Sequence, residues 1–294
     1  MNSSNISGKE LYRWYQQAKE EAIANDIQPD EVDWLLQTVT NLDSLSLRLG
    51  TYKQRSLIQS DRPLPDLIQL WQQRLQERLP VQYLVETVFW RRFQLRVNPA
   101  VLIPRPETEL IIDIARENNL ITEDEQHWVD LGTGSGAIAL GLAEIFPQAT
   151  IHAVDISSDA LKIALENAIN LKLKQNIRFY QGSWWNPLNL EGKVTGMVSN
   201  PPYIPTEEID NLQAEVAHEP RIALDGGDDG LDDIRCLIKD APRYLVSGGI
   251  WLVELMMGQA ETVAKLLEQQ GEYSKIDIYQ DLNGIERFVL AYRR

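Results

Sequence analysis

A strand, a glycine-rich turn, a helix and a second strand follow one another in the middle of this chain, and no other feature narrows its possible folds as much. The apolar run His127–Leu131 leads into Gly132–Gly136 (GTGSG) and then into the helical pattern Ala137–Glu144. The next apolar run, Ala149–Val154, ends at Asp155. Glycines between a strand and a helix let the backbone approach a ligand closely, with the helix N-terminus directed at it. The pattern predicts one βαβ unit of a parallel sheet that binds a nucleotide-like cofactor.

The two acidic residues of this unit suit different parts of a cofactor. Asp155, at the end of the second strand, can accept hydrogen bonds from both ribose hydroxyls. Asp130 ends the first strand, where its carboxylate would repel a pyrophosphate but suits the ammonium of a bound amino acid. S-adenosylmethionine carries both groups, together with an adenine and a methyl on a cationic sulfur. Gly132, Gly134 and Ala137 also satisfy the dinucleotide fingerprint, so NAD stays open as an alternative on spacing alone.

A second candidate site is the sequence Asn200-Pro201-Pro202-Tyr203, here called the NPPY elbow. Each proline ring fixes its own φ and restricts the residue before it, so the chain cannot continue as a regular strand or helix. Because neither proline has an N–H, the elbow offers mainly carbonyl acceptors, the Asn200 amide and the Tyr203 ring. The Asn200 carbonyl and a main-chain carbonyl can each accept one N–H of an –NH2 group, while Tyr203 packs against a planar group. The elbow predicts chemistry on a planar nitrogen, although an ordinary turn is the alternative.

A third candidate site follows the predicted strand Ile177–Tyr180. Ligands of open α/β sheets bind outside the carboxyl ends of the strands. Ser183 and Trp184 come just after this strand, so we expect them beside the adenine of the cofactor. A core or surface position for Trp184 is the alternative.

Taken together, these motifs resemble those of class I S-adenosylmethionine-dependent methyltransferases, and specifically the peptide chain release factor glutamine methyltransferase family (HemK/PrmC). The most specific segment is Leu102–Glu109 (LIPRPETE), which matches the family's segment ahead of the catalytic core. Further on, Glu219–Gly227 (EPRIALDGG), with Gly230 and Leu231 after it, is similar to the family's next signature. The NPPY elbow alone is shared with adenine-N6 and ribosomal RNA enzymes.

The resemblance implies that S-adenosyl-L-methionine is the cofactor and that the protein substrate is a class 1 peptide chain release factor. The methyl group would go to the side-chain nitrogen of the glutamine in its Gly-Gly-Gln loop. The expected catalytic residues, which also grip the substrate, are Asn200, Pro201, Pro202 and Tyr203. Further substrate contacts are assigned to Arg105, Glu107, Thr108 and Glu109. Cofactor contacts are expected at Asp130, Gly132, Thr133, Gly134, Ser135, Gly136, Asp155, Ser183, Trp184 and Asn200.

The chain departs from the family pattern at one visible place. After Pro80–Tyr83 (PVQY) the family usually has Gly, and this chain has Glu86. The departure concerns the adjoining turn and not the chemistry.

The substrate nitrogen sets the expected mechanism. An amide nitrogen is a poor nucleophile because its lone pair is delocalised into the carbonyl. The sequence shows no strong general base at the NPPY elbow. We therefore expect the rate to come from positioning, with the two N–H groups held by the Asn200 side chain and the Pro201 carbonyl. These acceptors also favour the positive charge that grows on nitrogen in the transition state.

Cysteine and histidine usage excludes two classes of site. Cys236 is the only cysteine, which excludes an internal disulfide framework and suits a reducing compartment. It lies in the apolar stretch Ile234–Ile238, so we expect it to be buried. The three histidines, His127, His152 and His218, lie far apart and lack metal-ligand spacing, so no metal is expected.

The N-terminus is polar and the sequence has no long apolar run, so neither a signal peptide nor a membrane span is expected. A cytoplasmic location follows as an expectation.

Charge bears on the partner. Residues 1–98 hold 12 basic and 12 acidic residues, so the net charge of −15 belongs to residues 99–294. Because nucleic acid binding normally uses a basic surface, this distribution disfavours direct nucleic acid binding and favours a basic protein partner. A general solubility effect of the acidic residues is the alternative. A nucleic acid amino-methyltransferase acting on a flipped base and, less favoured, an NAD-binding oxidoreductase stay open as other functions.

Three successive segments of the chain differ in their patterns. Residues 1–80 carry apolar stripes at helical spacing and predict a small helical bundle, which the resemblance assigns to release factor binding. Residues 81–100 are β-prone and aromatic and predict a linking β-hairpin. Residues 101–294 predict the methyltransferase domain, an α/β, doubly wound, mostly parallel seven-stranded Rossmann-like sheet.

Two details are expected within the helical bundle. Asp30 precedes an apolar stripe as a candidate helix N-cap. Ile68, Trp71, Leu75 and Leu79 recur at helical spacing and are expected in the core.

Overall fold

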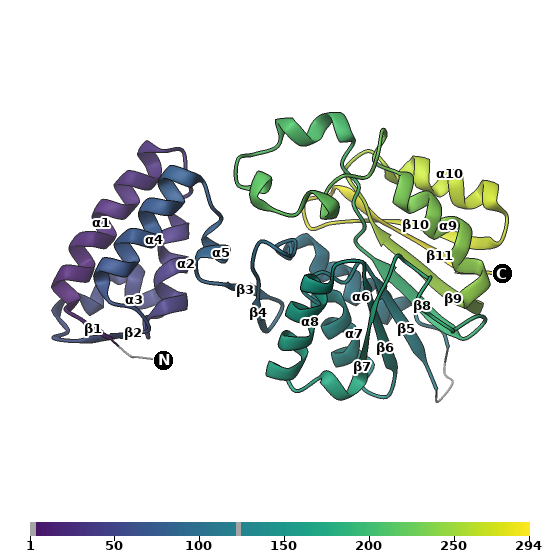
Figure 1. Ribbon diagram of the computed structural model, residues 1–294, viewed down its shortest axis with the longest axis horizontal. Helices are drawn as coiled ribbons and strands as arrows, with labels where there is room; N and C mark the ends of the chain where they lie inside the picture. Colours follow the sequence, from purple (N-terminus) through teal and green to yellow (C-terminus); the bar gives the residue numbers. More distant parts are fainter. Residues whose placement is uncertain (1–3, 122–124) are drawn as a thin grey trace. The chain divides into compact units, whose positions relative to one another are not determined.

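The computed structural model describes residues 4–121 and 125–294 of the chain. It forms two compact units, which are drawn in Figure 1. The helical unit comprises Met1–Thr87 and Ala214–His218, and the sheet unit comprises Val88–Gln213 and Glu219–Arg294. The division falls inside the segment expected to be the linker, at its first strand.

The helical unit consists of amphipathic helices around an apolar core. Its elements are β1 (Ser4–Ile6), α1 (Gly8–Ala24), α2 (Asp30–Val39), α3 (Ser44–Leu49), β2 (Ile58–Ser60), α4 (Leu64–Glu77) and α5 (Val81–Leu84). Leu11, Leu36 and Trp71 are fully buried in one cluster, so the stripes of the three long helices share a core. Strands β1 and β2 pair antiparallel in a small sheet that the helical stripes do not predict.

Two detailed expectations for the helical unit are wrong. Asp30 is the first residue of α2 and makes no side-chain cap; its carboxylate lies in the first turn, where it favours the positive end of the helix dipole. Ile68 is 39% exposed. The buried face of α4 is formed by Leu67, Trp71 and Arg74 instead, which shifts the stripe by one position.

A hairpin of β3 (Thr87–Trp90) and β4 (Phe93–Arg96) precedes the main sheet. Glu86, just before β3, has a φ of 51°. This left-handed conformation is uncommon for residues with a side chain and favours glycine. The departure from the family pattern therefore falls at a position where the backbone itself suits Gly.

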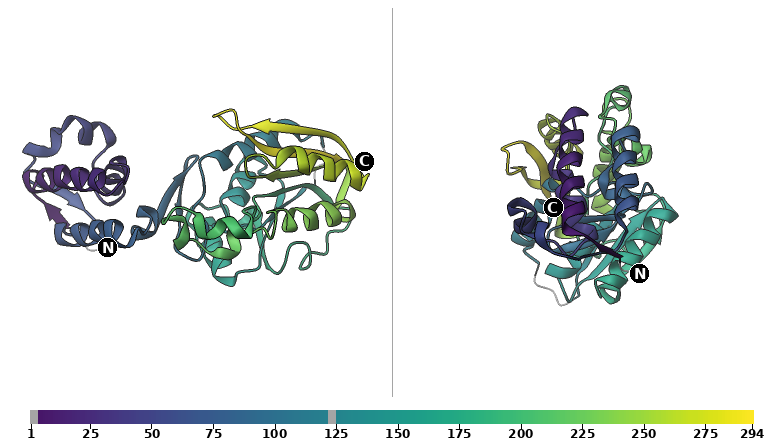
Figure 2. Two further views of the ribbon diagram at one scale, coloured as in Figure 1. Left: turned by 90° about the horizontal axis from the view of Figure 1, so that it is seen from above. Right: turned by 90° about the vertical axis from the view of Figure 1, so that its left-hand side faces the viewer.

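The main sheet has seven strands in the order β10-β11-β9-β8-β5-β6-β7. The strands are β5 (His127–Leu131), β6 (Thr150–Asp155), β7 (Ile177–Gln181), β8 (Val194–Ser199), β9 (Leu245–Glu254), β10 (Tyr273–Gln280) and β11 (Glu286–Arg293). Strand β11 runs antiparallel to both of its neighbours, and the remaining neighbours are parallel. In Figure 2 the two C-terminal strands lie side by side in yellow at one edge of this sheet.

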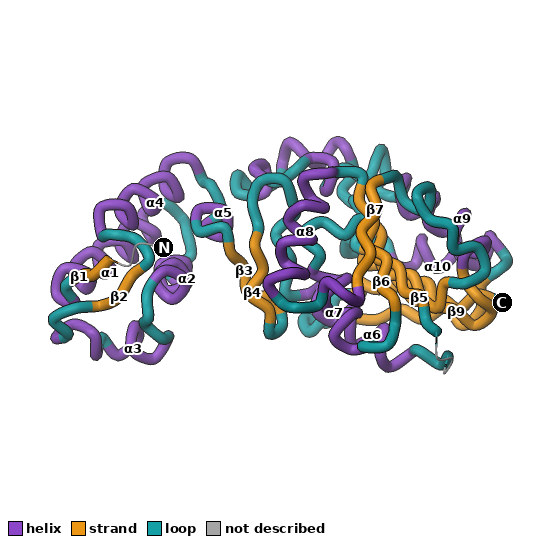
Figure 3. Tube along the Cα trace, turned by 60° about the horizontal axis from the view of Figure 1, so that its bottom comes forward, coloured by secondary structure: helices purple, strands orange, loops and turns teal. Residues whose placement is uncertain are grey.

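Helices cover both faces of the sheet, as Figure 3 shows. They are α6 (Leu110–Asn118), α7 (Ala137–Ile145), α8 (Ser158–Asn170), α9 (Asp232–Tyr244) and α10 (Ala260–Gln270). Helices α9 and α10 share a core with Val129 and Trp251 of one face. Trp128 points to the opposite face, because strand side chains alternate, and its ring stacks on Phe146 after α7 with 4.5 Å between centroids. The doubly wound, mostly parallel sheet is confirmed.

The strand register aligns four polar or glycine positions at the carboxyl edge of the sheet. Leu131 pairs with Val154 on one side and with Ser199 on the other, and Ser199 pairs with Val253. The residues that follow these partners are therefore neighbours along the edge. In spatial order they are Asp155, Gly132, Asn200 and Glu254.

Cys236 is exposed, which corrects the expectation that it is buried. Helix α9 buries Ile234, Leu237, Ile238 and Ala241, and the helical period leaves Cys236 between these positions on the solvent side. In the ranges 4–121 and 125–294, we find no helix both long and apolar enough to span a membrane.

Candidate active site

A cavity opens at the carboxyl edge of the sheet. Among the residues lining it are several predicted site residues: Gly132, Gly134, Asp155, Ser183, Trp184, Asn200 and Pro202. Further parts of the wall come from Ala100–Leu102 ahead of the sheet and from Pro220, Ile222 and Ala223 after the NPPY elbow. Segments that lie far apart in the sequence thus form one site at the edge where the register places them.

The glycine-rich turn joins β5 to α7 at the floor of the cavity. Its Gly134 has a φ of 53°, and a Cβ added there would meet no atom within 4 Å. The turn therefore presents bare backbone to open space, which is the close approach that a ligand phosphate or amino acid group requires. The Gly134 N–H donates to Asp155 Oδ2 at 2.8 Å and ties the turn to the end of β6.

Asp155 is held in place by the backbone around it. Besides the bond from Gly134, its Oδ1 accepts from the Ser157 N–H at 2.9 Å. Burial is the main cause that raises the pKa of Asp155. The carboxylate lines the cavity with both oxygens already oriented.

Asp130 lies fully buried beneath the turn and does not line the cavity. Its Oδ2 accepts from the Thr133 hydroxyl at 2.6 Å and from the Ala139 N–H at 3.0 Å. Its Oδ1 has no hydrogen-bond partner, and burial raises the pKa of this carboxyl to about 7. A buried carboxylate oxygen without a partner is one that a nearby cationic group would stabilise.

Three further predicted residues of the turn are buried and support it. Thr133 bonds Asp130 as described, and the Ser135 carbonyl accepts from the Asn167 side chain at 2.9 Å. Gly136 is the N-cap of α7. These three residues shape the turn from below and do not line the cavity.

Trp184 serves both the cavity and the core. Its indole N–H donates to Asp233 Oδ1 at 3.2 Å, and its ring lies 3.5 Å from the position of a Cβ on Gly132. The ring also packs against the core cluster under α9. Ser183, beside it, lines the same cavity.

The NPPY elbow is braced by residues 224–230 that follow it, here called the glycine segment. The Ile204 N–H donates to the Leu224 carbonyl, and the Gly226 N–H donates to the Ile204 carbonyl, each at 2.9 Å. Gly230 has a φ of 74°, and a Cβ there would collide with the Tyr203 carbonyl. The Gly226 and Gly230 positions of the downstream signature are therefore explained by close backbone packing.

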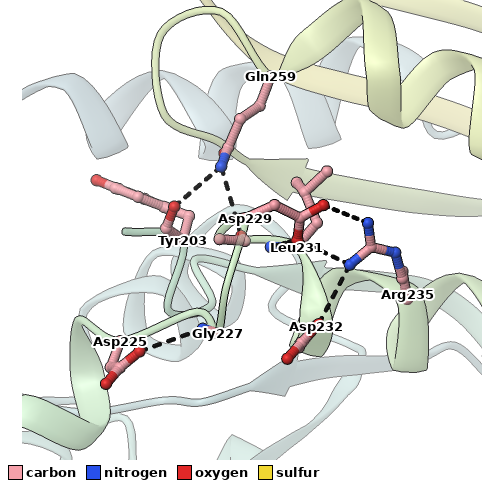
Figure 4. Close-up of polar contacts among 9 residues, drawn as sticks. Tyr203, Asp225, Gly227, Asp229, Leu231, Asp232, Arg235 and Gln259 are labelled. Atoms are coloured by element: carbon pink, nitrogen blue, oxygen red, sulfur yellow. Dashed lines mark hydrogen bonds and ion pairs between the residues drawn. The ribbon is translucent and has the colours of Figure 1, made fainter. Parts of the chain in front are cut away.

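Gln259 completes this brace at the start of α10. Figure 4 shows its amide between the Tyr203 carbonyl and the glycine segment. The Gln259 Nε2 donates to the Tyr203 carbonyl at 2.9 Å and to the Gly230 carbonyl at 3.4 Å, while its Oε1 accepts from the Met256 N–H at 3.0 Å. One buried side chain thus connects the elbow, the glycine segment and α10.

Residues 104–109 (PRPETE), here called the PRPETE segment, pack behind the elbow. Arg105 forms an ion pair of 2.7 Å with Glu219, whose side chain is buried, so the segment is joined directly to the downstream signature. The Trp90 indole donates to the Arg105 carbonyl at 3.0 Å. Glu109 accepts from the Arg91 N–H at 2.7 Å, which anchors the segment to the hairpin.

Thr108 and Asn200 bring the two most specific motifs into contact. The Asn200 Nδ2 donates to Thr108 Oγ1 at 3.3 Å, and Thr108 is buried. Glu107 is half-buried, and its charge acts on both Tyr203 and Glu254. Of the four predicted residues, Thr108 contacts the elbow directly, Arg105 pairs with Glu219, and Glu109 binds the hairpin, while Glu107 acts on the site through its charge.

Glu254 is the site residue that the sequence did not reveal. It ends β9 and is buried, and its Oε2 has no hydrogen-bond partner. Burial raises the pKa of Glu254 to about 7, although the Thr108 and Asn200 side chains act to lower it. An acid that ends an otherwise apolar strand (GIWLVE) is the only sequence signal for it.

Within residues 4–121 and 125–294, no group of three or more His, Cys, Asp or Glu side chains is arranged so that it could hold a metal ion.

Comparisons with known proteins show the family of this chain. Residues 122–285 match the family model of a methyltransferase domain. The chain is 52% identical to the release factor glutamine methyltransferase of Synechocystis sp. over 99% of both chains. It is 43% identical to the release factor glutamine methyltransferase of Thermosynechococcus vestitus over 97% of this chain and 99% of the relative.

The solved structure of the hMettl16 catalytic domain in complex with the MAT2A 3′UTR hairpin 6 has a TM-score of 0.56 and 14% identity, with 88% of each chain covered. At that identity the likeness concerns the fold alone. The two relatives carry the assignment, because their identity extends over nearly the whole chain. The chain belongs to the release factor glutamine methyltransferase family.

Proposed function

We propose that this protein transfers a methyl group from S-adenosylmethionine to the side-chain amide nitrogen of the glutamine in the Gly-Gly-Gln motif of class 1 peptide chain release factors. The observation that carries the proposal is the NPPY elbow, whose Asn200 and Pro202 line a cavity shared with the glycine-rich turn. The relatives in Synechocystis sp. and Thermosynechococcus vestitus are release factor glutamine methyltransferases, which supports the same substrate.

The residues of the cavity fit the cofactor. Gly134 offers open backbone, and Asp155 offers an oriented carboxylate for the ribose hydroxyls. The unpartnered oxygen of Asp130 fits a nearby ammonium group. Ser183 and the ring of Trp184 are available to the adenine. When bound, S-adenosylmethionine would supply a methyl group on a cationic sulfur.

The elbow holds the substrate amide in our proposal. The Asn200 Oδ1 and the Pro201 carbonyl each accept one N–H of the glutamine side chain, and Tyr203 packs against its planar amide. The Tyr203 carbonyl is already engaged by Gln259, so it contributes to the shape of the elbow. Holding both N–H groups fixes the direction of the nitrogen lone pair, and orientation of this kind is a large contribution to catalysis.

We further propose that residues 1–80, which form most of the helical unit, help to bind the release factor. It contains a groove lined by residues of α1, α2 and α3, among them Tyr12, Lys19 and Trp34. Leu45 and Leu49 on its rim are 54% and 63% exposed, and exposed apolar side chains beside a groove are typical of a protein contact. The double substitution Leu45→Asp and Leu49→Asp should raise KM for the release factor and leave kcat unchanged.

Methyl transfer from labelled S-adenosylmethionine tests the main proposal. The wild type should label purified release factor, and Asn200→Ala should lose most of this transfer while it still binds the cofactor in calorimetry. Labelling of DNA or RNA in preference to release factor would contradict the proposal and favour a nucleic acid amino-methyltransferase. Equal loss of transfer and cofactor binding in Asn200→Ala would contradict the division of roles.

A further inference from the structure

Three polar side chains from distant parts of the chain meet behind the NPPY elbow. Glu254 at the end of β9 is 1% exposed, and Thr108 of the PRPETE segment is 4% exposed. The register of β8 and β9 places Glu254 beside Asn200 at the edge of the sheet. The Asn200 Nδ2 donates to Thr108 Oγ1 at 3.3 Å, and both side chains favour the charged form of Glu254 by lowering its pKa, while Glu254 Oε2 has no hydrogen-bond partner. The proposed mechanism has so far given Glu254 no role.

The chemistry of the groups decides how they face one another. An ionised carboxylate only accepts, so it attracts the hydroxyl proton of Thr108. The Thr108 oxygen can then accept from the Asn200 –NH2, whose nitrogen lies 3.3 Å away. The Asn200 side chain also lowers the pKa of Glu254, as its –NH2 would and its oxygen would not. The carboxylate, whose Oε2 has no hydrogen-bond partner, would repel the Asn200 oxygen, so the Asn200 nitrogen faces Glu254 and Thr108.

This arrangement determines which end of the Asn200 amide faces the substrate. With its nitrogen turned inward, Asn200 turns its Oδ1 to the cavity, where an acceptor is needed for a substrate –NH2. The flipped amide would present –NH2 to –NH2, two donors that cannot bond each other. Nothing in the shape of an Asn side chain distinguishes the two orientations, because oxygen and nitrogen are nearly equal in size.

We propose that Glu254 is a positioning residue for methyl transfer, whose carboxylate, acting with Thr108, fixes the Asn200 amide with Oδ1 toward the substrate nitrogen. The inference rests on the proposed function and deepens it. It also gives the PRPETE segment a role in the reaction, since the Thr108 hydroxyl helps to orient the Asn200 amide of the elbow.

The groups around Glu254 determine the pH range in which its carboxylate is ionised and can orient the Asn200 amide. The pKa of Glu254 is raised to about 7, chiefly by burial and with a smaller contribution from Glu107, while Thr108, Arg287 on β11 and Asn200 act to lower it. Burial above all, and then the nearby Glu254 charge, raises the pKa of Tyr203. Arg287 also pairs with Asp281 at 2.8 Å, so its charge is shared. A protonated Glu254 becomes a donor and competes with Thr108, so orientation weakens as pH falls through the pKa.

A double-mutant cycle on Glu254 and Asn200 tests the inference with wild-type release factor as substrate. Glu254→Gln should lower kcat about 10- to 100-fold, because a loosened acceptor misplaces the reacting nitrogen. KM for the release factor and the calorimetric Kd for S-adenosylmethionine should stay unchanged. In the Asn200→Ala background, Glu254→Gln should cause no further loss, because Glu254 would then have no amide to orient.

The pH profile gives a second readout that a merely structural role would not move. Wild-type kcat should rise as pH increases through about 7, where Glu254 ionises, and Glu254→Gln should lack this rise. Thr108→Val, which removes only the hydroxyl between Glu254 and Asn200, should also lower kcat. Glu144→Gln is the matched control, since Glu144 is a partly buried acid on α7 that pairs with Arg92 away from the cavity.

The possible failures are distinguishable. A wild type that does not methylate release factor overturns the proposed function. An active wild type whose loss in Glu254→Gln multiplies with that of Asn200→Ala, or whose pH profile survives Glu254→Gln, overturns only the role of Glu254. If Glu254→Gln does not fold, as judged by lost cofactor binding, Thr108→Val decides: wild-type kcat in that variant would overturn the inference.

Discussion

Glu86 shows how a single residue can carry backbone strain without touching the chemistry. Its φ of 51° lies in the left-handed region, yet it has a side chain. The family usually has Gly at this place, and the structure gives the reason in the backbone. Strain here belongs to the turn before the hairpin, outside the residues that line the cavity.

Substitution at Glu86 tests whether the backbone at this position is strained for a residue with a side chain. Glu86→Gly should be more stable than Glu86→Ala by about 1 kcal/mol. The left-handed backbone conformation is strained for Ala and unstrained for Gly. The greater freedom of Gly in the unfolded state offsets part of this advantage. Urea unfolding of the two variants measures the difference. Equal stability would mean that the turn relaxes to a different conformation.

Asp130 predicts a pH dependence of stability in the protein without cofactor. Its pKa rises from 3.8 to about 7 on folding, so between these pH values the folded state keeps a proton that the unfolded state loses. The contribution of Asp130 therefore turns more destabilising as pH rises through this range. Asp130→Asn should gain stability relative to the wild type between pH 4 and pH 7. Thermal unfolding at several pH values measures the difference in stability between Asp130→Asn and the wild type. A difference that does not change with pH would contradict the raised pKa of Asp130.

At the scale of elements, the sequence predicts what depends on local pattern. The succession from His127 to Asp155 is sufficient to place two strands, a helix and the cofactor turn, because each step has its own periodicity or turn chemistry. The exposure of Cys236 and Ile68 is missed, since a shift of one helical position changes which side chains face the core. Glu254 is missed for a different reason: its partners reach it only through strand register and the packing of the PRPETE segment.

The link between α10 and the elbow is also invisible in sequence and makes a prediction. Gln259→Leu leaves the Tyr203 and Gly230 carbonyls without their donor. Loss of a partner to a buried polar group costs about 1–3 kcal/mol, so we expect lower thermal stability and a lower kcat. Gln259→Glu is the matched variant, because it keeps the acceptor for the Met256 N–H and loses only the donor. Wild-type kcat in both variants would show that the elbow keeps its shape without Gln259.

At the scale of the whole molecule, charge separates the two parts of the chain. Residues 1–98 are balanced, and the net charge of −15 lies in residues 99–294, which contain the cavity. A field of this sign steers a basic partner and repels a nucleic acid backbone. The charge distribution thus favours a protein substrate independently of the relatives' names.

Salt should therefore affect encounter and not chemistry. The Debye length falls from about 10 Å at 0.1 M to about 3 Å at 1 M salt, so long-range attraction is screened over that range. We expect kcat/KM for the release factor to fall with salt while kcat stays constant. A kcat/KM that is independent of salt would assign the acidic charge to solubility alone.

The identity of the modified atom is the central claim, and tandem mass spectrometry of the release factor tests it most directly. After incubation with the protein and S-adenosylmethionine, one methyl group should be found on the side-chain nitrogen of the Gly-Gly-Gln glutamine. It should be absent with Asn200→Ala and with a release factor in which that glutamine is replaced. A methyl group on any other residue, or an unmodified glutamine despite cofactor binding, would contradict the account.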